Sequence, residues 1–288
     1  MKPLPTRPCW RWQSVLLLTL LAHFGIALAH PDPRGDIHAR VSVVAGAFEV
    51  RYQVHPVDEP DDSDRPLDVL GDRYAANGER LVERGEVEGE EGATRLAGEI
   101  YEGRVGEVRY RTTVDRDGAV VSEVVSPPGS RTQRLLPFPP GLELIYLADA
   151  LVTGQGIALA AVVSRREEGR FGILWHPHGV EQGPTFVELA VPSMIYDYPV
   201  ASNLVWTEGR FWIATMRAPT PVAPSQPILW SWKPGDNEAR QRLVEGEGAA
   251  DTTMSMAAIG GRLCLAFHRS DEESSLAQVA VHFEKTEP

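Results

Sequence analysis

Three aspartates hold matching places ahead of short turns, and their side chains are of the kind that performs acid–base catalysis. Asp36, Asp197 and Asp251 lie ten, twelve and ten residues before the glycine of such a turn. Carboxylates at equivalent places of repeated units can converge on one pocket, where one serves as base and another, with a raised pKa, as acid. Aspartate also commonly caps a strand that follows a turn. The sequence therefore leaves a catalytic and a structural interpretation of this set open.

Aromatic residues flank the middle member of the set. Tyr196 and Tyr198 enclose Asp197, and two rings beside an acid can stack on a sugar or grip a peptide. The alternative is ordinary alternation along a strand, with one ring in the core and the other at the surface. Glu143 occupies a comparable place in another part of the chain and is a further acidic candidate. We predict ligand binding at Tyr196, Asp197 and Tyr198.

Two histidines and an acidic loop raise the question of a metal site. His176 and His178 stand on either side of a proline where a strand is expected to end. A solvent-exposed turn near the outer rim is the simpler interpretation of this pair. The acidic run at residues 58–64 has the composition of a calcium loop, but a proline interrupts it and the EF-hand spacing is missing. We therefore predict no metal and no cofactor.

The first 29 residues have the features of an export signal that is removed. A basic start precedes a short apolar core, and an Ala-Leu-Ala cleavage site precedes His30. The new N-terminal amine and the imidazole of His30 could chelate copper, with His38 or His55 as a further ligand. Copper binding stays open at this point. We predict that residues 30–288 form a protein located in the periplasm or outside the cell.

The elements that would carry these residues repeat along the chain. One series consists of leucines that recur every 54 residues, at Leu81, Leu135, Leu189 and Leu243. A second series consists of small turns before apolar runs, with glycines at Gly46, Gly103, Gly154, Gly209 and Gly261. Regular self-similarity at this length is typical of folds in which one unit cannot bury its own faces and packs on the next.

The third and fourth units show most clearly what one unit contains. Short runs rich in β-branched and aromatic residues, bounded by glycine and polar clusters, predict strands rather than helices. They cover residues 142–152, 157–163, 172–175 and 185–189 in one unit and 203–206, 211–216, 227–230 and 239–244 in the next. Five units of about four antiparallel strands predict an all-β fold, a five-bladed β-propeller formed by one domain, with an acidic insertion at residues 57–67. A stacked solenoid is the competing architecture.

The fifth unit ends early. Strands are expected at residues 254–259, 262–268 and 278–283, and the chain stops before a fourth. Either the last blade has three strands, or residues 30–33 supply the fourth. Two prolines make that segment a poor strand, so both solutions stay open.

Two segments resemble the blade repeats of exported bacterial β-propeller proteins, namely residues 204–214 (LVWTEGRFWIA) and 256–266 (MAAIGGRLCLA). The resemblance covers the last three units well and the first two poorly, and it implies a type of blade rather than an activity. The Ser-x-Asp-x-Gly-x-x-Trp repeat of sialidases is absent. Five-bladed glycoside hydrolases use carboxylates at the mouth of the central channel, which is the chemistry that Asp36, Asp197 and Asp251 would then supply.

Composition limits the partners. A net charge of −12 at pH 7 repels phosphate backbones and anionic lipid heads, so we predict no nucleic acid partner. No second apolar span follows the signal, so no membrane insertion is expected. Cys264 lies in an apolar run, which predicts a buried, unreactive thiol. Tryptophans at strand positions are expected to pack between blades, and they are Trp175, Trp206, Trp212, Trp230 and Trp232.

Clear repeats without a nucleophile, metal or cofactor motif favour a non-catalytic module as the leading interpretation. Such an exported propeller would bind a protein or carbohydrate ligand that the sequence does not identify. A glycoside hydrolase-like enzyme is the first alternative, with Asp36, Asp197 and Asp251 as its carboxylates. A structural or assembly scaffold is the second.

Overall fold

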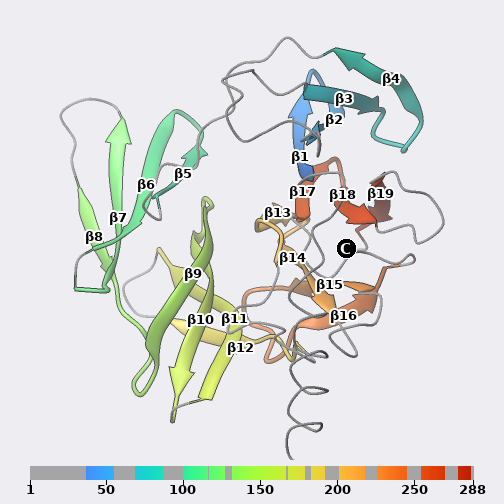
Figure 1. Ribbon diagram of the computed structural model, residues 1–288. Helices are drawn as coiled ribbons and strands as arrows, with labels where there is room; N and C mark the ends of the chain where they lie inside the picture. Colours follow the sequence, from blue (N-terminus) through green and yellow to red (C-terminus); the bar gives the residue numbers. More distant parts are fainter. Residues whose placement is uncertain are drawn as a thin grey trace, which may run out of the picture.

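The computed structural model describes residues 37–54, 69–86, 100–115, 117–126, 132–166, 168–178, 183–191, 201–217, 226–244, 254–269 and 278–286. Within these ranges the regular secondary structure is β-strand, in agreement with the sequence pattern. The strands form five separate antiparallel sheets, and each sheet uses strands that follow one another in the chain. Figure 1 shows the sheets following one another around a common centre.

Each sheet is one blade. Blade 1 contains β1 (Ile37–Val44), β2 (Ala47–Val54), β3 (Val69–Tyr74) and β4 (Arg80–Glu86); blade 2 contains β5 (Ile100–Val105), β6 (Val108–Val114), β7 (Val120–Ser126) and β8 (Gln133–Leu136). Blade 3 contains β9 (Glu143–Val152), β10 (Gly156–Arg165), β11 (Glu168–Pro177) and β12 (Thr185–Glu188); blade 4 contains β13 (Val205–Thr207), β14 (Arg210–Arg217), β15 (Gln226–Trp232) and β16 (Arg240–Leu243). Blade 5 contains β17 (Met254–Ile259), β18 (Arg262–Arg269) and β19 (Gln278–Lys285).

The predicted five-bladed β-propeller is confirmed. Among the described strands, the first strand of each blade pairs with the second, and the remaining strands follow outward in chain order. In the described part of blade 5 there are three strands. The segment considered as a fourth strand, residues 30–33, lies outside the described residues, as does the acidic insertion at residues 57–67.

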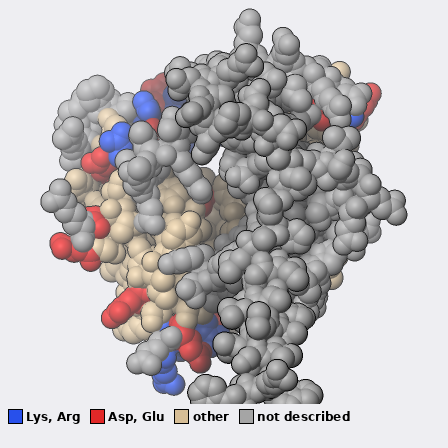
Figure 2. Space-filling model, viewed as in Figure 1, with Lys and Arg blue, Asp and Glu red and all other residues tan. Residues whose placement is uncertain are grey.

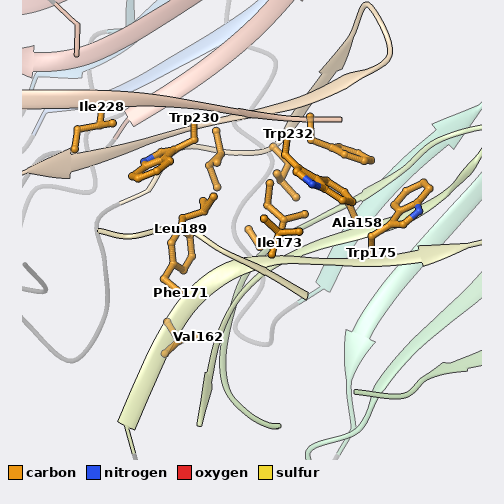
Figure 3. Close-up of a cluster of buried hydrophobic side chains, with 14 residues drawn as sticks. Ala158, Val162, Phe171, Ile173, Trp175, Leu189, Ile228, Trp230 and Trp232 are labelled. Carbon is orange, nitrogen blue, oxygen red and sulfur yellow. The ribbon is translucent and has the colours of Figure 1, made fainter. Parts of the chain in front are cut away.

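Packing between blades holds the propeller together, and the contact of blade 3 with blade 4 is the richest in aromatic rings. The ring centroid of Phe211 lies 5.1 Å from that of Trp175, 4.4 Å from that of Trp206 and 6.1 Å from that of Trp232. Figure 3 shows side chains of both blades, among them Ile173 from blade 3, directed into this common cluster. Because both faces of a blade are covered by neighbours, nearly all of β10 is buried. The predicted role of the tryptophans is confirmed.

The single described cysteine lies in another of these contacts. Cys264 is fully buried on β18 beside Ala266, and both pack against Phe48 and Val50 of blade 1. Leu265 and its neighbours in the alternate positions face blade 4 instead. Burial raises the pKa of the Cys264 thiol to about 12. The prediction of a buried thiol is confirmed, and its register is that predicted from the turn glycines.

One detail of the repeat was predicted incorrectly. The first hairpin of blade 2 turns at Gly106, which has a positive φ of 60°, and Gly103 lies inside β5. A glycine at an even interval was therefore mistaken for the one that the left-handed backbone requires. The leucine series is also not structurally uniform, since Leu81, Leu135 and Leu243 are exposed while Leu189 is buried. Equal spacing marks the outermost strand of each unit, but it does not fix the direction of the side chain.

Candidate functional site

The innermost strands of neighbouring blades are joined by side-chain hydrogen bonds, beginning with blades 2 and 3. The Tyr101 hydroxyl on β5 donates to the carbonyl oxygen of Leu147 on β9 at 2.7 Å. Farther along β9, Asp149 Oδ2 accepts the backbone N–H of Leu204 from blade 4 at 2.6 Å. This charge-assisted hydrogen bond ties β9 to the start of blade 4.

The series continues through blades 4, 5 and 1. Asn203 meets Met256 twice, since its Nδ2 donates to the Met256 carbonyl and its Oδ1 accepts the Met256 N–H, both at 2.8 Å. Ser255 Oγ then accepts the N–H of Val41 in blade 1 at 2.9 Å. We call the contacts made by Tyr101, Asp149, Asn203 and Ser255 the axial belt.

The axial belt lies at one level of the propeller. Each of its four residues stands five or six residues before the glycine of the turn that ends the innermost strand of its blade, and so does Val41, the residue that Ser255 contacts. The innermost strands therefore start together at one end of the axis and turn together at the other. Sequence reasoning missed this belt, because its residues share no residue type and the turn glycine of blade 2 was taken to be Gly103 instead of Gly106.

Each predicted site residue comes a few positions before the residue of its own blade that takes part in the axial belt. Asp36, Tyr196, Asp197, Tyr198 and Asp251 all fall outside the described residues, so their side chains are not part of the observed geometry.

Glu143 is the one acidic candidate within the described chain. It is the first residue of β9, lies opposite Ser164 of β10, and is exposed. Glu143 precedes Asp149 by six residues. Their partners on β10, Ser164 and Ala160, are only four residues apart, because the pairing of β9 with β10 has two irregularities. An exposed carboxylate therefore stands at the strand-entry end of the axis in blade 3.

The histidine pair differs from its prediction. His176 is not on an exposed turn but buried on β11, and its Nε2 has no hydrogen-bond partner in the part of the chain that the structure describes. Burial, with a smaller contribution from the positive charge of Arg134, lowers the pKa of His176 to about 4. His178 is exposed, and its ring Nε2 lies 3.1 Å from the Thr153 carbonyl, where it donates. The prediction failed because β11 continues to Pro177 and its alternation turns His176 toward blade 2.

Within the described part of the chain, no group of three histidine, cysteine, aspartate or glutamate side chains could hold a metal ion. His30 and His55, considered for copper, lie outside that part, and so do the acidic residues 58–64. His38 belongs to β1, opposite Gln53. No helix among the described residues is long and apolar enough to cross a membrane. On the face drawn in Figure 2, the charged side chains of described residues lie toward the periphery, with uncharged surface between them.

The comparisons with known proteins found a likeness in fold alone. No family model matches the sequence, and no curated protein matches it. Among solved structures it is similar to an RS223 β-xylosidase (10% identity, 89% of this chain and 94% of that one, TM-score 0.40). It is also similar to a GH43_1 enzyme from Xanthomonas citri complexed with xylotriose (13%, 89% and 88%, TM-score 0.38) and a glycosyl hydrolase from Bacteroides ovatus (8%, 86% and 84%, TM-score 0.38).

These names correct the leading interpretation drawn from the sequence. A non-catalytic binding module was expected, whereas the solved structures of similar arrangement are named as glycoside hydrolases. The expectation rested on missing motifs. A pair of catalytic carboxylates needs no contiguous motif, because residues from different blades assemble it in space.

Proposed function

We propose that this protein is a carbohydrate-active hydrolase whose site lies at the end of the axis where the innermost strands begin. Asp36, Asp197 and Asp251 would supply its carboxylates, and Tyr196 and Tyr198 would stack on the sugar. The export signal expected at residues 1–29 suits such an enzyme, because polysaccharides are too large to reach it inside a cell.

The hydrogen bond between blades 5 and 1 is the observation that carries the proposal. Val41 N–H lies 2.9 Å from Ser255 Oγ, so β1 and β17 are held side by side. Asp36 comes five residues before Val41, and Asp251 four residues before Ser255. Extended chain rises about 3.3 Å per residue, so the two carboxylates would reach similar heights on neighbouring blades. A glycosidase needs its two carboxyl groups about 5–9.5 Å apart.

The carboxylates would differ in their protonation state. One, kept protonated, would donate its proton to the glycosidic oxygen as the bond to the sugar breaks. A second, ionised, would either activate a water molecule or attack the sugar carbon itself, and the separation of the two decides which. A third would hold the acid in place and raise its pKa by the repulsion of like charges. Exposed Glu143 at the start of β9 is available for one of these roles.

The test is hydrolysis of 4-nitrophenyl glycosides and of neutral and acidic polysaccharides by the purified protein and by Asp36→Asn, Asp197→Asn and Asp251→Asn. Loss of the general base or nucleophile should reduce kcat by about 10²–10⁴-fold on every substrate. Loss of the general acid should spare the nitrophenyl glycosides, because nitrophenolate leaves without a proton, and should abolish polysaccharide cleavage. Asp117→Asn, an exposed residue of blade 2, is the matched control.

Two results would overturn the proposal. One is the absence of hydrolysis across the whole panel by the folded protein. The other is full activity in all three variants, which would move the chemistry away from this end of the axis. Equal activity in the Asp117→Asn control and the unmodified protein is required for the comparison.

A further inference from the structure

A cleft of about 170 Å³ opens between the outer part of blade 4 and blade 5. Its floor includes Trp212, Leu229 and Ser231 from β14 and β15. Strand register explains the grouping, since Trp212 lies opposite Ser231, and Ser231 lies opposite Arg240 of β16. One row of side chains thus crosses the blade from an aromatic ring to a guanidinium.

Four cations and one carboxylate line the cleft. Arg242 Nη1 is 2.6 Å from Glu284 Oε1, and Arg210 Nη1 is 3.5 Å from Asp236 Oδ2, so two cations are neutralised. Arg240 and Lys285 are exposed and form no ion pair with any residue in the described ranges. In a chain of net charge −12, two uncompensated cations in one cleft produce a local field that attracts an anion.

The floor offers an apolar surface, formed by the indole ring of Trp212 and by Leu229. Trp212 is 9% exposed, and its indole N–H is buried with no hydrogen-bond partner among the described residues. A free inorganic anion makes no use of an indole ring or of Leu229. A sugar does, because one face of its ring is apolar and can pack on the indole ring.

We propose that this cleft binds a single residue of an acidic saccharide, with its carboxylate between Arg240 and Lys285. A guanidinium presents paired N–H donors that match a carboxylate. The volume is smaller than the roughly 300 Å³ at which pockets for larger ligands begin, which limits the occupant to about one sugar unit. Because β14, β15, β16 and β19 lie outside the innermost strands, the site is separate from the axis and independent of the proposed hydrolase.

Isothermal titration of the purified protein with D-glucuronate tests the proposal, with D-glucose and inorganic phosphate as comparison ligands. Glucuronate should bind at least about tenfold more tightly than either, because only it carries both the charge and the ring. Arg240→Gln and Lys285→Gln should each weaken glucuronate about tenfold, the loss of one charge-assisted hydrogen bond. Both positions are exposed, so the variants should unfold at the same temperature as the unmodified protein.

Charge-matched controls separate a site from a diffuse field. Arg165→Gln on blade 3 and Lys233→Gln on blade 4 remove the same charges from exposed positions that do not line the cleft, and they should leave binding unchanged. If they weaken glucuronate as much as the cleft variants do, the site does not exist. Glucose binding equal to glucuronate would refute recognition of the anion, and phosphate binding equal to it would refute recognition of the sugar.

Discussion

Blade 4 makes two contacts of opposite character with its neighbours. Toward blade 3 it presents a dry aromatic cluster in which Trp230 Nε1 donates to Thr215 Oγ1 at 2.8 Å and Trp232 Nε1 donates to the Asp236 carbonyl at 2.9 Å. Toward blade 5 its inner part is apolar, but its outer part opens into the cationic cleft, and the buried Trp212 N–H beneath it has no partner among the described residues. One face of the same sheet is closed by aromatic packing, and the other carries the exposed cations Arg240 and Lys285 at a cleft that has room for a ligand.

The largest expected effect comes from breaking the aromatic contact. Trp232→Ala should reduce the free energy of unfolding by about 3–5 kcal/mol, since the side chain is almost fully buried against Phe211. Urea unfolding followed by circular dichroism measures it. Trp212→Ala is the counterpart beside the cleft and should cost clearly less, because its ring already borders open space. Equal losses would show that the two contacts are equally well packed.

A third contact, between blades 2 and 3, adds a buried group that titrates. The pKa of His176 is lowered from 6.5 to about 4. Between pH 6.5 and 4, therefore, His176 binds a proton in the unfolded chain but not in the folded protein. Stability should therefore fall as the pH drops from about 6.5 to 4 and show no contribution from His176 above that window. The contribution is at most about 3 kcal/mol.

The difference between variants isolates this contribution from the other titrating groups. His176→Gln should flatten the pH dependence of the free energy of unfolding between pH 6.5 and 4. His178→Gln, at an exposed position on the same segment, should leave it unchanged. An unchanged slope in His176→Gln would show that His176 is protonated equally in both states.

The axial belt should matter less than the aromatic contact. Asn203→Ala removes both hydrogen bonds to the backbone of Met256, whose side chain is buried. We expect a loss of about 1–3 kcal/mol in the free energy of unfolding, because two backbone groups lose their partner. Exposed Asn237→Ala should stay within about 0.5 kcal/mol. If Asn203→Ala loses no more unfolding free energy than this control, water replaces the two hydrogen bonds of Asn203 without a cost in stability.

Sequence reasoning succeeded where local chemistry decides the structure. Glycine turns and β-branched runs predicted the strands of blades 3, 4 and 5 closely, because both depend on near neighbours in the chain. It failed where alternation and distant contacts decide, as for His176, whose burial depends on β11 extending to Pro177 and on blade 2 covering it. The cleft was also missed, since Arg240 and Lys285 come together only through the packing of blade 4 on blade 5.

The smallest effect gives the sharpest form of the comparison between the two faces of blade 4. Trp230→Phe removes an indole N–H that is bonded to Thr215 Oγ1, so it should cost about 1 kcal/mol of unfolding free energy beyond the lost contacts of the smaller ring. Trp212→Phe removes an N–H that has no partner, so only the ring contacts are lost and the buried donor no longer opposes folding. Urea unfolding of both variants under one set of conditions should therefore rank Trp212→Phe as the more stable. The reverse order would show that the Trp212 N–H is satisfied in solution, and that the open face of blade 4 is as complete as the closed one.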